Sequence, residues 1–120
     1  MNLPAASRLR QEVRTLRTER ALLEEQILQP LRLLRASLIR RRLGSGKDRR
    51  TKAYEYLSIP GPKGRPRLLY VRRRDVDRVE REVQAYRTYR KTLARLRALS
   101  PRMLSVLKAL GRNQEVAPPR

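Results

Sequence analysis

The stretch GSGKDRR, residues 44–50, combines glycines with basic side chains and so has the composition of a phosphate-holding loop. The phosphate-binding loop of nucleotide hydrolases requires G-x-x-x-x-G-K-[ST] between a strand and a helix. Arg41 stands where the first glycine belongs, and Asp48 stands where a hydroxyl residue would bind magnesium. The stretch therefore predicts a basic connecting loop and argues against a nucleotide site.

Candidates for catalysis are few. The chain has no Cys and no His, so it lacks disulfides, thiolate zinc ligands and the commonest general base. Asp75 and Asp77 fit a helix start, where capping and the helix dipole explain them. Tyr70 lies among arginines, but a tyrosine nucleophile of the strand-transfer kind needs a larger assembled site. We assign no catalytic residue, metal or cofactor and expect no enzymatic activity.

Positive charge dominates the composition. The 120 residues include 31 Lys and Arg against 11 Asp and Glu, a net charge of +20. Most of the basic residues are arginine, whose planar fork suits phosphate, although a GC-rich genome also produces an arginine excess. Such a charge favours a polyanionic partner, and nucleic acid is the first candidate because basic proteins bind it with release of counterions.

The charge is concentrated between Arg32 and Arg74, where fifteen basic residues face two acidic ones, a net charge of +13. A solvated charged face usually mixes signs, so this segment is the expected nucleic-acid contact. The candidate phosphate contacts are Arg40, Arg41, Arg42, Lys47, Arg49, Arg50, Lys52, Lys63, Arg65, Arg67, Arg72, Arg73 and Arg74. Three tyrosines are interleaved with them, Tyr54, Tyr56 and Tyr70, and either stack on unpaired bases or pack the strands on helices.

Apolar spacing predicts helices at both ends of the chain. Residues 7–29 carry a seam at alternating steps of four and three, formed by Leu9, Val13, Leu16, Leu23 and Ile27, with Arg20 at the skipped position. Arg20 fixes the register of a pair or extends its guanidinium to the edge of the seam. Pro30 predicts a break, followed by a second helix over residues 31–43 with Leu31, Leu34 and Leu38 as its stripe and Gly44 at its end.

A β-hairpin is predicted next. Residues 53–59 and 67–73 are rich in strand-forming residues and flank the turn PGPKGRP. Alternation places Tyr54, Tyr56 and Ser58 on one face of the first strand, and Glu55, Leu57 and Ile59 on the other.

The last third of the chain again has helical spacing. Asp75 precedes a predicted helix over residues 76–100, whose seam is Val76, Val79, Val83, Tyr86 and Leu93, with Arg90 at the gap. Ser100-Pro101 predicts the start of one further short helix before Gly111.

The fold class expected from these elements is mostly α with a small β-hairpin (α+β). We expect an antiparallel helical pair or coiled coil with a projecting two-stranded hairpin. Residues 1–112 form one domain and residues 113–120 a disordered tail. The seams suit pairing within one chain or between two copies, and the sequence leaves both open. No apolar run of membrane-spanning length and no signal-peptide core is present, so we expect a cytoplasmic protein without a membrane partner.

Three stretches, LLRASLIRRR (Leu33 to Arg42), AYEYLS (Ala53 to Ser58) and LYV (Leu69 to Val71), resemble an uncharacterised family of short bacterial proteins often described together with transposases. The resemblance covers roughly Leu9 to Leu99. It implies the order helix, knuckle, hairpin and helix, and a DNA or mobile-element context. The family's knuckle is Cys-rich with zinc-like spacing, whereas this chain has LGSGKDRRTK there, so no metal role transfers.

We therefore predict a small, basic, non-enzymatic nucleic-acid-binding protein that uses the hairpin and its flanking arginines. DNA is favoured, because a two-stranded ribbon enters a major groove, and RNA is the second candidate. The alternative is a non-catalytic assembly subunit of a larger nucleoprotein complex that binds RNA or a partner protein.

Overall fold

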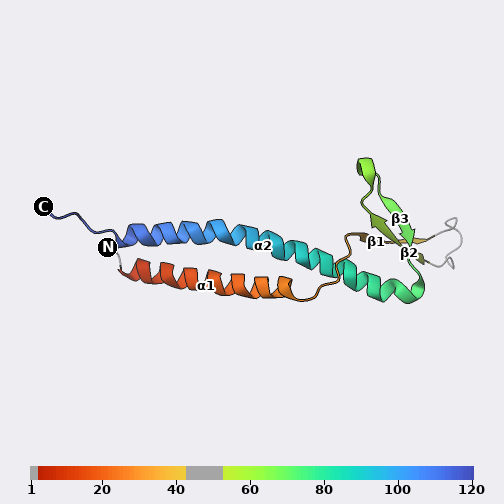
Figure 1. Ribbon diagram of the computed structural model, residues 1–120, viewed down its shortest axis with the longest axis horizontal. Helices are drawn as coiled ribbons and strands as arrows, with labels where there is room; N and C mark the ends of the chain where they lie inside the picture. Colours follow the sequence, from red (N-terminus) through yellow and green to blue (C-terminus); the bar gives the residue numbers. More distant parts are fainter. Residues whose placement is uncertain (1–2, 43–52) are drawn as a thin grey trace. The chain divides into compact units, whose positions relative to one another are not determined.

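The computed structural model describes residues 3–42 and 53–120, and Figure 1 labels its elements. In chain order they are α1 (Leu3–Leu28), β1 (Ser37–Arg42), β2 (Ala53–Ile59), the 3-10 turn η1 (Pro62–Gly64), β3 (Arg67–Tyr70), the 3-10 turn η2 (Arg73–Asp75) and α2 (Val76–Gln114). The chain forms two compact units, Met1–Pro30 with Arg90–Arg120, and Leu31–Tyr89. The predicted class, mostly α with a small antiparallel sheet, is confirmed. None of the described helices is long and apolar enough to cross a membrane.

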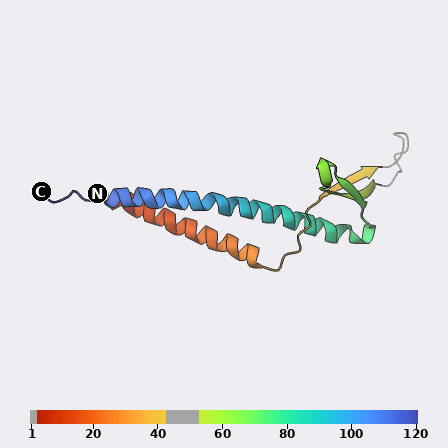
Figure 2. The same ribbon diagram turned by 45° about the horizontal axis from the view of Figure 1, so that its top comes forward.

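The first unit is an antiparallel pair made by α1 and the C-terminal part of α2, which lie side by side in Figure 2. Pro4 occupies the first turn of α1, where no amide donor is needed. The helix ends at Leu28, two residues before Pro30, because proline disfavours helical geometry in the residue that precedes it. The long helical segments predicted at both ends of the chain therefore pair within one chain.

Leucine, valine and methionine fill the space between these helices. The buried cluster comprises Leu16, Leu99, Met103 and Val106, with Leu9, Val13, Leu23 and Leu96 packed against it. The seam predicted on α1 is thus confirmed at four of its five apolar positions. The continuation predicted on α2 through Leu93 is wrong, since Leu93 is exposed and the series through Leu96 and Leu99 faces α1.

Arg20 lies at the edge of this seam. Its Nη1 donates to Sδ of Met103 at 3.8 Å, and its Nε pairs with Glu24 at 3.5 Å. The side chain remains 43% exposed, so its aliphatic part covers the core while the guanidinium keeps contact with water. This is the edge position that the sequence predicted as an alternative to a buried register-setting role.

Two ion pairs join the helices at positions seven residues apart. Arg95 donates to both carboxylate oxygens of Glu19, at 2.5 and 2.9 Å, and Arg102 donates to Glu12. A step of seven along α1 matches a step of seven backward along α2, so both pairs require the same antiparallel register. Hydrogen bonding from Arg95 lowers the pKa of Glu19, so this contribution is present at neutral pH and lost as the pH falls through the folded-state pKa.

Pro101 lies inside α2, so the prediction of a new helix at Ser100-Pro101 is wrong. Leu99 and Met103 on either side of the proline are both buried in the seam, while Pro101 itself is exposed. Packing on α1 therefore holds the helix together across a residue that cannot donate its amide. Beyond Gln114, residues 115–120 contain neither helix nor strand.

The second unit contains a three-stranded antiparallel sheet in the order β1-β2-β3. The helix predicted over residues 31–43 is wrong, because Ser37–Arg42 is strand β1, and the two-stranded hairpin gains a third strand as a result. Leu34, Ala36 and Leu38 pack on the unit's core at every second residue, the period of extended chain. The amide of Leu34 donates to the carbonyl of Glu82 in α2 at 3.1 Å, which fixes the segment before β1.

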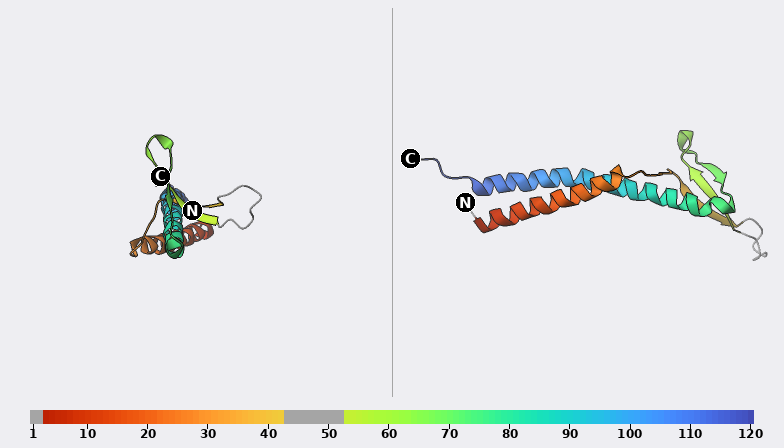
Figure 3. Two further views of the ribbon diagram at one scale, coloured as in Figure 1. Left: turned by 90° about the vertical axis from the view of Figure 1, so that its right-hand side faces the viewer. Right: turned by 60° about the horizontal axis from the view of Figure 1, so that its bottom comes forward.

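One face of the sheet packs on the N-terminal part of α2, and Figure 3 shows this unit from two further directions. The buried cluster consists of Leu57, Val71, Val79 and Val83. Ile59 packs against it beside Leu57, so the predicted inward face of β2 is confirmed. Here Val79 and Val83 pack on the sheet, whereas the prediction placed them in the helix–helix seam.

Leu99 supplies the test of the helix pair, because its side chain is fully buried. We expect Leu99→Ala to lower the free energy of unfolding by about 2–5 kcal/mol, through lost burial and the cavity left behind. Leu104→Ala is the matched control on the same helix, since Leu104 is 54% exposed, and it should change stability far less. Chemical denaturation followed by circular dichroism measures both, and equal losses would contradict the packing described.

Candidate nucleic-acid interface

Most of the predicted phosphate contacts that the structure describes are exposed and unpaired. Seven of them are exposed and have no acidic partner among residues 3–42 and 53–120: Arg41, Lys63, Arg65, Arg67, Arg72, Arg73 and Arg74. Arg40 differs, because its Nε pairs with Glu55 at 2.6 Å. Arg42 ends β1, and only its backbone is described. The remaining four, Lys47, Arg49, Arg50 and Lys52, lie outside the described residues.

The turn between β2 and β3 holds a first group, Lys63, Arg65 and Arg67, termed here the turn cluster. The turn closes through η1, where the Arg65 amide donates to the carbonyl of Pro62 at 3.3 Å. Lys63 has φ 58° and ψ 30°, a left-handed conformation that is unfavourable for a residue with a side chain. A charged residue is thus held at a position where glycine would cost less.

The chain entering α2 holds a second group, Arg72, Arg73 and Arg74, termed the helix-entry cluster. The preceding residue, Val71, is buried, and its amide donates to the carbonyl of Glu55 at 2.9 Å. The amide of Asp75 donates back to the carbonyl of Arg72 at 2.8 Å. Three cations therefore lie at the positive end of the α2 dipole, where an anion is the favoured neighbour.

Between the two clusters lies a surface of three tyrosines, Tyr54, Tyr56 and Tyr70, termed the tyrosine face. The ring of Tyr70 is 6.1 Å from that of Tyr54 and 5.9 Å from that of Tyr56, between centroids. Tyr70 is 56% exposed. Packing of the strands on α2 is made by Leu57 and Ile59 of the other face, so the helix-packing alternative for the tyrosines does not describe their contacts.

The two clusters flank this face along β3. Arg67 begins β3, and Arg72 follows its end in extended conformation, with φ −62° and ψ 142°. Five residues of extended chain span about 17 Å. A linear polyanion that contacts both clusters therefore passes over the tyrosine side of the sheet or along the edge of β3.

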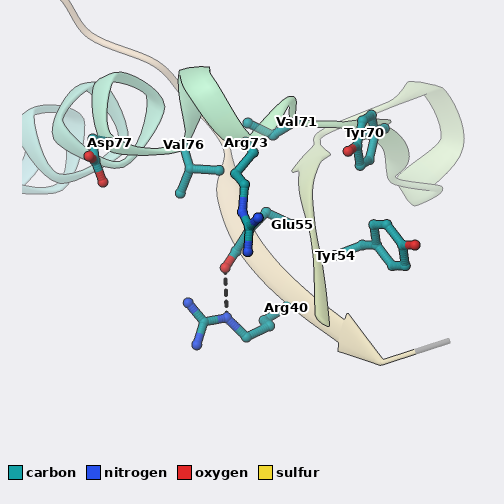
Figure 4. Close-up of a pocket in the computed structure, with 8 residues that line it drawn as sticks. All are labelled: Arg40, Tyr54, Glu55, Tyr70, Val71, Arg73, Val76 and Asp77. Atoms are coloured by element: carbon teal, nitrogen blue, oxygen red, sulfur yellow. Dashed lines mark hydrogen bonds and ion pairs between the residues drawn. The ribbon is translucent and has the colours of Figure 1, made fainter. Parts of the chain in front are cut away.

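A cavity of about 720 Å³ opens beside the tyrosine rings (Figure 4). Its lining comprises Arg40, Tyr54, Glu55, Tyr70, Val71, Arg73, Val76 and Asp77. Two arginines and two carboxylates balance in charge, and Arg40 and Glu55 already neutralise each other. Figure 4 shows the two tyrosine rings together, apart from the Arg40–Glu55 pair. Within residues 3–42 and 53–120 no three acidic side chains gather as ligands of one metal ion.

The sequence did not place β1 beside the tyrosines. In the antiparallel register Ile39 is opposite Tyr56, and Arg41 is opposite Tyr54, so both share the outward face. The signal for this strand was the alternation of Leu38 and Ile39 after Leu34 and Ala36, which a helical spacing through Leu31, Leu34 and Leu38 obscured. Sequence reasoning also missed Glu55 as the partner that neutralises Arg40.

Comparisons of the chain with family models, with curated proteins and with solved structures returned no match.

Lys63 provides a test of the turn geometry. We expect Lys63→Gly to raise the free energy of unfolding by about 1 kcal/mol, because glycine adopts the left-handed conformation without the steric cost. Lys91→Gly removes the same charge from an exposed position within α2 and should lower it by about 1 kcal/mol. Denaturant unfolding of both variants gives the comparison, and a loss of stability in Lys63→Gly would contradict the strained turn.

Proposed function

We propose that this chain is a small nucleic-acid-binding protein, without catalytic activity of its own, that contacts phosphates through the turn cluster and the helix-entry cluster. The observation that carries the proposal is the set of exposed arginines and lysine in residues 31–89 that have no acidic partner among the described residues. Elsewhere in the same unit, acidic side chains are used in pairs, such as Arg32–Glu82 at 2.8 Å.

Electrostatics supports a polyanion as the partner. Unpaired like charges repel one another in the folded protein, and a phosphate backbone relieves the repulsion while releasing its own counterions. The helix-entry cluster adds to this effect, because backbone amides and the dipole at a helix N-terminus also favour phosphate. Arginine supplies six of the seven exposed contacts, and its fork pairs with two phosphate oxygens at once.

DNA is our first candidate and RNA the second. The resemblance to short bacterial proteins described together with transposases adds a mobile-element context to the proposal and names no further site residue. The sheet has three strands, so contact through its face and turn replaces insertion of a two-stranded ribbon as the simplest binding geometry.

Replacement of the helix-entry cluster tests this function. We expect Arg72→Gln, Arg73→Gln and Arg74→Gln together to weaken binding to an oligonucleotide by about tenfold or more at low salt, and to reduce the salt slope by up to about three contacts. Removing three cations from a helix N-terminus relieves an unfavourable dipole interaction, so the unfolding midpoint should not fall. Fluorescence anisotropy titrations at several salt concentrations measure affinity and slope.

The matched control is Arg8→Gln, Arg14→Gln and Arg17→Gln, which removes the same charge from exposed positions of α1. It should lower affinity much less, because those residues lie outside the clusters. Equal losses in the two triple variants would assign binding to total charge alone. Absence of binding by the parent protein to any nucleic acid at low salt would overturn the proposal and favour a protein-binding assembly subunit.

A further inference from the structure

The tyrosine face is the exposed feature of the sheet that phosphate binding leaves unexplained. Three aromatic rings contact one another on the side of the sheet opposite Leu57. Leu68, 42% exposed, lies on the same face, since it is paired with Ser58. An apolar and aromatic surface flanked by unpaired cations suits a ligand that is apolar at its centre and anionic along its edge.

We infer that the tyrosine face and its adjoining cavity bind an unpaired nucleobase of a single-stranded nucleic acid. This inference rests on the proposed function and specifies its ligand. Bases held within a duplex are already stacked on their neighbours, whereas an unpaired base exposes a π-face that stacks on an aromatic side chain. The turn and helix-entry clusters then contact the phosphates on either side of that base.

The cavity suits a neutral base better than a phosphate. Its volume of about 720 Å³ is within the range of small-molecule sites. Its lining is balanced in charge, because Arg40 pairs with Glu55 while Arg73 is matched by Asp77 on the same cavity. Hydrogen-bond donors of Arg73 and acceptors of Asp77 face the same space, and the edge of a base presents both kinds of group.

The cations outside the cavity supply the anionic part of the fit. Arg72 and Arg74 are exposed beside Arg73, and the turn cluster lies at the other end of β3. Base stacking and phosphate contact thus fall on separate residues. Substitutions can remove one contribution and leave the other, which makes the inference separable from the proposed function.

The experiment compares strands that differ only in their bases. Labelled oligo(dT), oligo(U) and an abasic deoxyribose strand of equal length are titrated with the parent protein, Tyr70→Leu and Tyr70→Phe. We expect the parent to bind oligo(dT) at least about fivefold more tightly than the abasic strand. Tyr70→Leu should lose that preference without weakening abasic binding, while Tyr70→Phe retains it. The oligo(U) arm establishes whether RNA is bound as well as DNA.

Tyr89→Leu is the matched control, because Tyr89 belongs to the other ring pair, with Tyr86 at 6.4 Å on α2, and should leave the preference unchanged. The chain has no Trp, so quenching of tyrosine fluorescence by oligo(dT) reports stacking independently and should diminish in Tyr70→Leu. Equal affinity of the parent for oligo(dT) and the abasic strand would overturn the inference while leaving the proposed function intact. Failure to bind either strand or a duplex at low salt would instead overturn the proposed function.

Discussion

Carboxylates are scarce in this chain, and the contacts between its elements depend on where they lie. Glu19 meets Arg95 between the two helices, Glu82 meets Arg32, and Glu55 joins β2 to β1 through Arg40. Exposed pairs of this kind add little stability one by one, but those between elements specify register. The acidic side chains are thus used within the scaffold, and the turn and the entry to α2 keep unbalanced positive charge.

The scaffold itself is held by aliphatic packing in two separate clusters. Leu99 lies at the centre of the helix pair, and Leu57 packs with Val79 and Val83 beneath the sheet. Because successive strand residues point to opposite faces, burying Leu57 directs Tyr54 and Tyr56 outward. Burial of Val71 similarly ends β3 and directs the following arginines into solvent beside α2. The candidate interface is therefore a consequence of which side chains the core takes.

Two local features of the interface are unfavourable for the isolated protein. Lys63 holds a left-handed backbone conformation, and Arg72, Arg73 and Arg74 gather at the positive end of a long helix. Backbone strain and like-charge crowding are common where a ligand supplies the missing favourable interaction. Both features lie beside the tyrosine face, which agrees with a ligand that brings negative charge to its two ends.

The sequence by itself determined the helical seam of α1, the alternation of β2 and the concentration of positive charge, because each follows from the order and type of neighbouring residues. It misjudged the segment with Leu34 and Leu38, which fits helical and extended spacing alike. The tertiary structure decided in favour of a strand, since β2 offered backbone hydrogen bonds and the core accepted every second side chain. It likewise carried α2 through Pro101 and paired Arg40 with Glu55, because both outcomes depend on partners distant in sequence.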